Sequence, residues 1–478
     1  MRGCWLRSSV DSAGVDEKGQ QLERTLTLRG AVTLNLLDMI GVGPFITLPL
    51  LIGAMGGPQA MLGWVLGALL AGCDGMVWAE LGAAMPEAGG TYAYLEQMYP
   101  GRVGRWLSFL FAFQLLLSAP LSVASGCIGV AAYAGSVVPG LQGHAVLVAV
   151  ASVVVAVALQ YRRLSGVKRV AQALLVVVLA TIAWTVVTGL WHGEWLRVVA
   201  VPSGAFHLDG AFFVGLASAM LIATYDYWGY YNVTFLGGEA KDPGRVIPRA
   251  VLWSIAIVAV LYLALNASVL SVMGADGLMK AQRMEIRQAM LSEFMQMAYA
   301  PSVGVVAAEM IGKIAAVLVM VTAFGSVFSL LLGYSRIPYA AARDGNFPAV
   351  FGRLHPTRGF PYVSLLVLAG VACVCCFFSL AHVIAALVVV RIVMQFSLQH
   401  VGVMLLRKRR PEMKRPFRMW RYPLPPIVAL VGFAYIVFVR RGSAKGLMIA
   451  GAVVLLGTIV FLLRGVRDTS DGARMGSR

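Results

Sequence analysis

Long runs of apolar residues dominate the chain, and short polar segments separate them. A helix needs about 20 mostly apolar residues to cross the hydrocarbon core of a bilayer. By that measure the pattern predicts twelve membrane-spanning helices, followed by a flexible tail after Arg467. The predicted spans lie near residues 31–52, 59–81, 106–138, 144–161, 170–190, 210–237, 250–273, 304–333, 361–380, 382–406, 423–439 and 446–463.

The overall composition agrees with this pattern and excludes other classes of protein. Of the 478 residues, 59% are apolar and only 13% are charged, against about 25% charged in a typical soluble domain. A soluble chain of this length could not cover its surface with so few polar groups. That excludes a cytosolic enzyme, a nucleic-acid-binding domain and a disordered protein. The net charge of +17 is explained by basic residues in cytoplasmic loops.

Lys and Arg are distributed unevenly between the two sets of loops. The loops after even-numbered spans hold 21 of them, and the loops after odd-numbered spans hold 7. Because cytoplasmic loops carry the excess of basic residues, we expect a multi-pass protein of the plasma (or inner) membrane with both termini in the cytoplasm. Arg440, Arg441 and Lys445 fall on the side that this orientation places outside, against the rule.

Cysteines and catalytic motifs give no sign of a metal site or an enzyme. Cys373, Cys375 and Cys376 lie in an apolar run with no histidine or acid at metal-ligand spacing, which favours core or lipid-facing side chains. The chain contains no H-E-x-x-H, G-x-S-x-G or P-loop pattern. We therefore expect no metal, no cofactor and no catalytic residues.

Two of the predicted spans contain interruptions that a simple anchor helix would not need. Span 1 holds Gly41, Gly43 and Pro44 within four residues, which lowers helix propensity and removes one backbone donor. Span 6 places an acid, a glycine and an amide among aromatic residues, in the segment 223–232. Backbone groups freed at membrane depth must be buried in protein or line a polar cavity.

The positions of these interruptions predict a binding site. Spans 1 and 6 are five apart, as expected if two inverted repeats each begin with a discontinuous helix. The backbone amides at Val42 and Gly43 then form the positive end of a half-helix and suit a carboxylate. The carbonyl ends of the first half-helices suit an ammonium group. Together these opposed ends fit a zwitterion.

Five motifs, in order along residues 28 to 425, resemble those of the amino acid–polyamine–organocation transporter superfamily. They correspond to the first span, the end of span 2, the loop after span 6, the segment after span 8 and the loop before span 11. The matching residues are Gly41 to Ile46; Glu80-Leu81-Gly82 with Pro86, Gly89-Gly90, Tyr92 and Tyr94; Gly238 to Pro243 with Ile247 to Ala250; Ser335-Arg336, Ala342 to Gly345, Pro348 and His355-Pro356; and Arg410 to Glu412, Arg415 to Phe417 and Tyr422-Pro423.

This resemblance implies an all-α integral membrane protein with the LeuT-type 5+5 inverted repeat. It implies a secondary transporter that moves amino acids by alternating access, as a proton symporter or an exchanger. The expected partners are the small-molecule substrate, the lipid bilayer and protons. The expected parts are a cytoplasmic tail (1–28), a ten-helix core (29–408, with repeats at about 29–192 and 209–408), and a segment (409–478) with a linker, helices 11 and 12 and a C-terminal tail.

Two departures from the family pattern leave the branch and the coupling open. Some proton-coupled members carry a lysine inside span 5, whereas here Lys168 stands at its start and the interior is uncharged. In the polyamine branch an acid directly follows the tryptophan of span 6, but here Gly229 follows Trp228. Sodium coupling also stays open, because span 8 offers the hydroxyls of Thr322, Ser326 and Ser329.

Substrate contacts are expected along both interrupted segments. The resemblance implies backbone contacts in span 1 and an aromatic gate at Tyr225. Five aromatic residues of span 6 cannot all face one pocket at helical spacing, and Tyr225 and Trp228, three apart, are the favoured pair. Asn232 donates to the substrate or caps the second half-helix. The full set of expected substrate-binding residues is Ile40, Gly41, Val42, Gly43, Tyr225, Asp226, Trp228, Gly229 and Asn232.

Four ionisable residues inside the spans are candidates for coupling or for an internal ion pair: Asp38, Asp74, Asp226 and Arg391. Asp226 could take up a proton in each cycle or pair with a substrate ammonium. A buried arginine needs a partner, and we expect one of the three acids beside Arg391. Outside the spans, Glu239 and Arg336 match family positions for gating or structural contacts.

Two other functions compete with amino acid transport. A polyamine or organic-cation permease would need two or more acids in the pocket, which the three aspartates supply if all point inward. A substrate-sensing receptor is the weaker alternative, because a fold alone does not separate sensing from transport. The sequence carries no signal of an oligomeric state.

Overall fold

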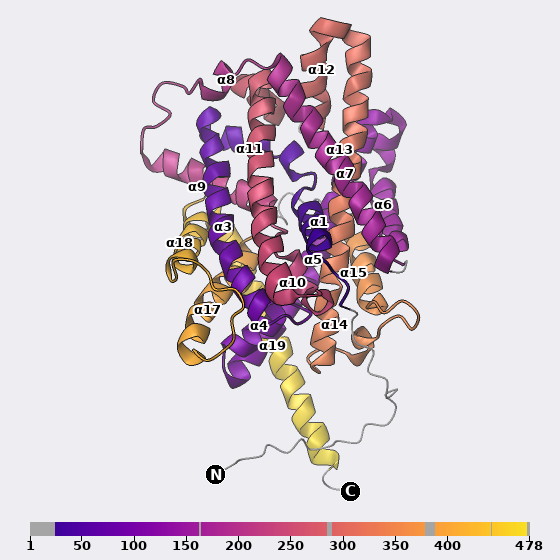
Figure 1. Ribbon diagram of the computed structural model, residues 1–478, viewed down its shortest axis with the longest axis vertical. Coiled ribbons are helices and arrows are strands. Elements are labelled where there is room, and N and C mark those ends of the chain that lie inside the picture. Colours follow the sequence, from indigo (N-terminus) through magenta and orange to yellow (C-terminus); the bar gives the residue numbers. More distant parts are fainter. Residues whose placement is uncertain (1–23, 162–163, 284–288, 378–387, 441, 476–478) are drawn as a thin grey trace.

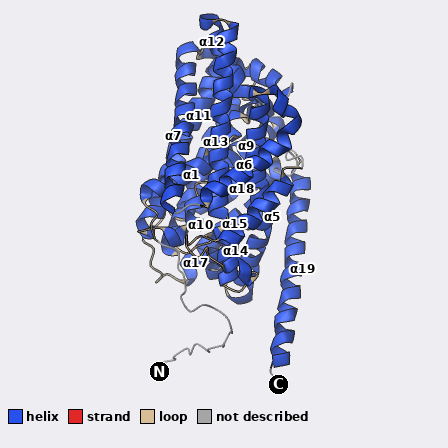
Figure 2. Cartoon of the chain, turned by 90° about the vertical axis from the view of Figure 1, so that its right-hand side faces the viewer, coloured by secondary structure: helices blue, strands red, loops and turns tan. Residues whose placement is uncertain are grey.

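The computed structural model describes residues 24–161, 164–283, 289–377, 388–440 and 442–475. This part of the chain is helical and contains no strand longer than an isolated bridge. The helices form one elongated bundle, and the start of α1 and the end of α19 point toward the same end of it (Figures 1 and 2). The prediction of an all-α membrane protein is confirmed. Residues 1–23 of the expected tail (1–28), the junction of spans 9 and 10 at 378–387 and the last three residues lie outside the described residues.

The bounds of the helices follow the predicted spans closely, with short helices between them. The α-helices are α1 (Leu28–Met39), α2 (Leu48–Met55), α3 (Met61–Ala84), α4 (Thr91–Met98), α5 (Gly101–Val137), α6 (Ala145–Gln160), α7 (Leu164–His192), α8 (Leu196–Val199), α9 (Gly210–Tyr227), α10 (Asn232–Phe235), α11 (Pro243–Arg283), α12 (Met290–Val303), α13 (Val305–Tyr334), α14 (Arg336–Arg343), α15 (Tyr362–Cys375), α17 (Leu398–Arg409), α18 (Leu424–Val439) and α19 (Ser443–Met475).

Eight of the described helices are long and apolar enough to cross a membrane. Residues 28–45 and α2 meet at a bend of 60° and together are also long and apolar enough, which gives a ninth candidate span. Three more apolar helices, α6, α15 and α18, are shorter. Every predicted span therefore coincides with an apolar helix, and span 1 is broken where its glycines and proline predicted a break.

Several helices extend beyond the predicted spans, because a hydropathy window measures lipid-facing length and not helix length. Helix α5 has 37 residues and contains Pro120. Helix α11 continues past a kink at Gly274, where φ is +66°. The segment between spans 7 and 8 contains α12, which packs on α13. Helix α19 continues to Met475, into the segment after Arg467 where the sequence predicts a flexible tail (Figure 2).

Helix α1 lies inside the bundle, where α7, α10, α11 and α13 pack around it (Figure 1). Helices that lie five spans apart in the predicted order pack on each other: α2 on α9, α3 on α11, α5 on α13, and α6 on α15. This arrangement brings the broken spans 1 and 6 together at the centre of the bundle. In span 10 a π-helix, Ile392–Ser397, precedes α17, and such wide turns often mark functional sites.

Candidate functional site

The break in span 1 leaves a stretch of free backbone inside the bundle. Helix α1 ends at Met39, and a single 3₁₀ turn over Gly43–Phe45 separates it from α2. Residues Gly41 to Gly43 are partly exposed, although most of their surroundings are buried. Within the described part of the chain, the N–H groups of Val42 and Gly43 form no hydrogen bond with the protein. These two donors are available to an anionic group.

The break in span 6 has a different origin. Helix α9 ends at Tyr227, Trp228 adopts an extended conformation, and Gly229 has a φ of +123°. Only glycine adopts that region without strain. The chain then turns into the short helix α10, which begins at Asn232.

The two breaks touch each other at Gly229. A Cβ atom added there would lie 2.7 Å from the backbone nitrogen of Met39 and 2.8 Å from the carbonyl carbon of Asp38. The missing side chain therefore lets the backbone of span 6 pack directly on the last turn of α1. The predicted juxtaposition of the two interruptions is present, and Gly229 is required for it.

Asp226 contacts the free backbone of span 1. Its Oδ2 accepts a hydrogen bond of 2.6 Å from the Thr47 hydroxyl. Its carboxylate lies so close to Gly43 that any side chain there would overlap Oδ1. Among the described residues Oδ1 has no hydrogen-bond partner. A buried carboxylate oxygen without a donor, beside a broken helix, can accept from a substrate ammonium.

Tyr262 of α11 holds the carbonyl ends of both half-helices near one point. Its hydroxyl donates to the carbonyl oxygen of Met39 at 2.6 Å and lies 3.3 Å from that of Asp226. Carbonyl ends of helices carry partial negative charge, so this corner favours a cation. Tyr262 was not predicted from the sequence, because a lone tyrosine in an apolar run gives no sign of the group that its hydroxyl contacts.

Two amides fix the second half of span 6. Asn35 donates to the Tyr230 carbonyl oxygen at 2.6 Å and accepts from the Val233 N–H at 3.0 Å. Asn232 donates to the Ser329 hydroxyl at 2.9 Å, so its side chain points to α13. Asn35 was not among the predicted site residues. The signal that could have found it is an amide in a mostly apolar helix, three residues before the buried Asp38.

The aromatic residues of span 6 separate into two groups. Tyr225 and Trp228 face each other, with ring centroids 6.1 Å apart, and Trp228 also stacks on Phe396 of the π-helix. Tyr231 stacks instead on Trp78, and Tyr227 packs in the core. The structure thus brings together the pair that helical spacing favoured.

Arg391 lies beside this aromatic pair with its guanidinium buried. It donates to the hydroxyls of Ser118 and Ser122, at 3.3 and 3.0 Å, and lies 6.0 Å from the Trp228 ring and 5.4 Å from that of Tyr334. Among the described residues it makes no ion pair with an acid. Serine hydroxyls and aromatic rings therefore make its direct contacts, and Asp38 attracts it electrostatically from beyond ion-pair distance.

The other two aspartates lie in separate surroundings. Asp38 is buried, and its Oδ2 has no hydrogen-bond partner in the described part of the chain. Asp74 accepts from the Tyr230 hydroxyl and from the Trp78 indole N–H, and it faces His400. Asp38 and Asp226 both act electrostatically on Tyr225 and Tyr262, as Arg391 does on Tyr225, whereas Asp74 pairs with His400. No group of residues in the described ranges has the makeup of a metal site.

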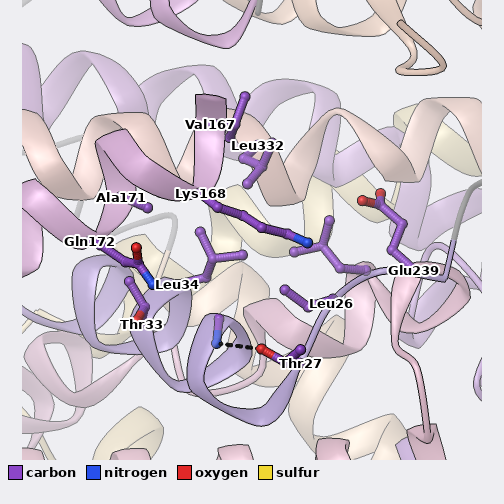
Figure 3. Close-up of a pocket in the computed structure, with 12 residues that line it drawn as sticks. Leu26, Thr27, Thr33, Leu34, Val167, Lys168, Ala171, Gln172, Glu239 and Leu332 are labelled. Carbon is purple, nitrogen blue, oxygen red and sulfur yellow. Dashed lines mark hydrogen bonds between the residues drawn. The ribbon is translucent and has the colours of Figure 1, made fainter. Parts of the chain in front are cut away.

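At the end of the bundle near the termini, a buried ion pair joins Glu239 to Arg336 at 2.8 Å. Beside it lies a small cavity of about 60 Å³. Figure 3 shows the Lys168 side chain extending across this cavity, with Glu239 on its other side. The Lys168 ammonium donates to the Thr25 carbonyl oxygen at 2.8 Å, so it ties the start of span 5 to the segment that leads into α1.

Comparison with known proteins gives consistent matches over most of the chain. The model of the amino acid permease family matches residues 26–463. The serine/threonine exchanger SteT of Bacillus subtilis is 26% identical over 87% of this chain and 90% of its own length. The human Asc-type amino acid transporter 1 is 25% identical over 93% of this chain and 83% of its own. The methylthioribose transporter of Bacillus subtilis is 23% identical over 90% and 91%.

Proposed function

The chain belongs to the amino acid permease family, and we propose that it moves a small zwitterionic amino acid across the plasma membrane by alternating access. The observation that carries this proposal is the meeting of the two breaks. Free N–H donors at Val42 and Gly43 lie in span 1, and the carbonyl ends of α1 and α9 meet at Tyr262. One site with donors on one side and acceptors on the other suits a zwitterion.

In this proposal the substrate carboxylate binds the N–H groups of Val42 and Gly43. The ammonium group binds the carbonyl ends and Oδ1 of Asp226, which has no other partner among the described residues. Tyr225 and Trp228 cover the side chain. Asn35 and Asn232 hold the second half of span 6 in position, because both make hydrogen bonds between helices.

The position of Arg391 favours an amino acid over a polyamine. Its guanidinium lies against Trp228 and makes no ion pair with an acid in the described part of the chain. A dication would have to enter beside this positive charge. The names of two relatives, an exchanger of serine and threonine and an Asc-type amino acid transporter, support the same choice. Transport by exchange or coupled to protons is part of the proposal.

The membrane arrangement is also part of the proposal. We infer that the shorter helices α6, α15 and α18 cross the membrane with the other nine spans, which gives twelve crossings. Both termini and the basic residues of 407–421 lie in the cytoplasm, as the distribution of Lys and Arg indicates. The start of α1 and the end of α19, which point toward one end of the bundle in Figure 1, agree with that orientation. The two repeats comprise residues 29–192 and 209–408.

Counterflow in proteoliposomes tests the substrate class. Vesicles loaded with one unlabelled compound are offered the same compound with a label, for L-serine, L-threonine, L-alanine, methylthioribose, putrescine and spermidine in turn. We expect transient accumulation of the small neutral amino acids and none of the polyamines. Empty vesicles and vesicles without protein are the controls. Accumulation of putrescine or spermidine alone would overturn the carboxylate site and make the aspartates the substrate ligands.

Asp226→Asn tests the ammonium site. Asparagine keeps the acceptor for Thr47 but loses the charge, and a hydrogen bond to a charged group contributes about 1.5–3 kcal/mol. We expect the KM for the amino acid to rise by about 10- to 100-fold, with a smaller change in maximal rate. Thr47→Val is the matched control, because it removes the neighbouring hydroxyl and leaves the carboxylate in place. An unchanged KM in Asp226→Asn contradicts the assignment.

The same variant tests whether Asp226 also carries a coupled proton. If Asp226 itself carried the coupled proton, Asp226→Asn would lose uptake driven by a pH gradient while counterflow persisted. Retention of full gradient-driven uptake rules out that proton role.

A further inference from the structure

A second polar contact inside the bundle lies away from the free backbone of span 1. Asp74 of α3 and His400 of α17 are both fully buried, and Oδ1 of Asp74 lies 3.2 Å from Nε2 of His400. Neither atom has a hydrogen-bond partner elsewhere in the described part of the chain. The contact joins residues 326 positions apart and lies within the hydrophobic core.

The other atoms of the two side chains decide how many protons the contact holds. Nδ1 of His400 lies 2.6 Å from the Phe396 carbonyl oxygen. A carbonyl oxygen only accepts, so Nδ1 must carry a hydrogen. The neutral ring then has a lone pair at Nε2, which faces Asp74. On the aspartate, Oδ2 already accepts from Tyr230 and Trp78.

An ionised Asp74 opposite a neutral His400 would therefore place two lone pairs against each other at 3.2 Å. Moving the ring hydrogen to Nε2 does not help, because Nδ1 would then oppose the Phe396 carbonyl oxygen. The two facing atoms, Oδ1 and Nε2, are both satisfied when one further proton lies between them, bound to the carboxyl group or to the ring. Burial without water makes an unsatisfied arrangement costly.

We propose that Asp74 and His400 form a binding site for a single proton, and that this proton holds span 6 in the described conformation. The proposal rests on the transport function above and adds a location for the coupled proton. The link to span 6 is Tyr230, which follows Gly229 in the break and donates to Asp74. Losing the proton forces the two side chains apart, and the Tyr230 contact moves with Asp74.

The surroundings contain few other groups that could titrate with this pair. Tyr230 and Tyr231 face it from the break, and Cys73 neighbours it on α3. Helix α18 contributes the apolar edge contact of Phe433 with the His400 ring. On the side of α4, the Thr91 hydroxyl donates to the Gln399 side chain, and this hydrogen bond joins two neutral groups.

The next charged contact between α3 and α17 is the pair of Glu80 and Arg407, with Arg415 also beside Glu80. It lies six and seven residues further along the two helices, toward the end that holds the termini. That pair combines an acid with a permanently charged arginine and so needs no shared proton. The contact at Asp74 and His400 differs from it in this respect.

Asp74→Asn and His400→Gln test the proposal in the full-length protein. The asparagine amide donates permanently to Nε2, and the glutamine amide donates permanently to Asp74, so neither variant exchanges a proton there. The control is Thr91→Val, which removes a neighbouring buried hydrogen bond that involves no titratable group. Each protein is purified in detergent, and its apparent melting temperature is measured from pH 5 to pH 9.

The sign of the expected result follows from proton counting. Above about pH 6.5 an unfolded aspartate is ionised and an unfolded histidine is neutral, so the two hold no titratable proton. The folded pair holds one. As the pH rises, this pair alone therefore increases the unfolding equilibrium constant of the wild type by about tenfold per pH unit, until the folded pair releases its proton. We expect both variants to lose that component, while Thr91→Val keeps the wild-type slope at a lower melting temperature.

Transport supplies the second readout. With the amino acid that accumulates best in the counterflow panel, we expect Asp74→Asn to retain counterflow and to lose at least tenfold of the stimulation by an inward pH gradient. Wild-type pH slopes in both variants would overturn the proposal. If the wild type shows no counterflow with any amino acid, the transport proposal fails, and the melting curves still decide whether the pair binds a proton.

Discussion

Gly229→Ala is expected to reduce amino acid uptake by about 100-fold, the size of loss that a misplacement of about 1 Å produces in a positioned site. The φ of +123° is strained for alanine, at a cost of about 1–3 kcal/mol. The larger effect is steric, because the new methyl group would meet the backbone of Met39 and Asp38 and not a flexible side chain. Span 6 must then move away from α1, and the acceptors at Tyr262 separate from the donors at Val42 and Gly43.

The matched control is Gly56→Ala at the end of α2. Gly56 also has a positive φ, +76°, but a Cβ there would meet nothing within 4 Å. The backbone strain is about 1–2 kcal/mol, and the two breaks stay in contact, so uptake should stay within about twofold of the wild type. Both variants are compared at equal amounts of monodisperse protein in proteoliposomes. Wild-type KM and rate in Gly229→Ala would show that the direct contact between the breaks is not needed.

The position of the breaks could be predicted because it depends on local chemistry. Gly41, Gly43 and Pro44 weaken a helix wherever they occur, and Gly229 permits the positive φ at which span 6 leaves its helix. The spacing of the two interrupted spans predicts the inverted repeat. These inferences need no knowledge of which helix lies beside which.

The partners of the polar side chains could not be predicted, because they depend on the rotation and pairing of the helices. Arg391 and the three aspartates are all inside spans, and charge alone suggested that they pair. The structure instead places serines beside Arg391, a threonine beside Asp226 and a histidine beside Asp74. Neutral hydrogen-bond donors are too common in helices for their sequence positions to distinguish these arrangements.

A buried ion pair near the termini gives the second large effect. Glu239 and Arg336 are almost fully buried, and the Glu239 carbonyl oxygen also accepts from the Leu26 N–H at 2.8 Å. The pair therefore joins the segment after span 6, the start of α14 and the segment that enters α1. Removing one partner of a buried ion pair costs about 3–5 kcal/mol, because the remaining charge is left without a partner.

We expect Glu239→Ala and Arg336→Ala each to lower the melting temperature and to abolish detectable uptake. The double variant Glu239→Gln/Arg336→Gln should recover much of the stability, since it leaves no unpaired charge and coupling between such residues is about 0.5–3 kcal/mol. Glu194→Ala is the control, because its ion pair with Arg197 is exposed and exposed pairs contribute little. Melting temperature and counterflow are measured on all four variants.

If the double variant recovers its melting temperature but not its uptake, the charges act in the transport cycle, in gating this end of the bundle. Recovery of both shows that the pair is structural. A loss in the double variant that equals the sum of the two single losses would contradict the coupling itself, because each residue would then act without the other.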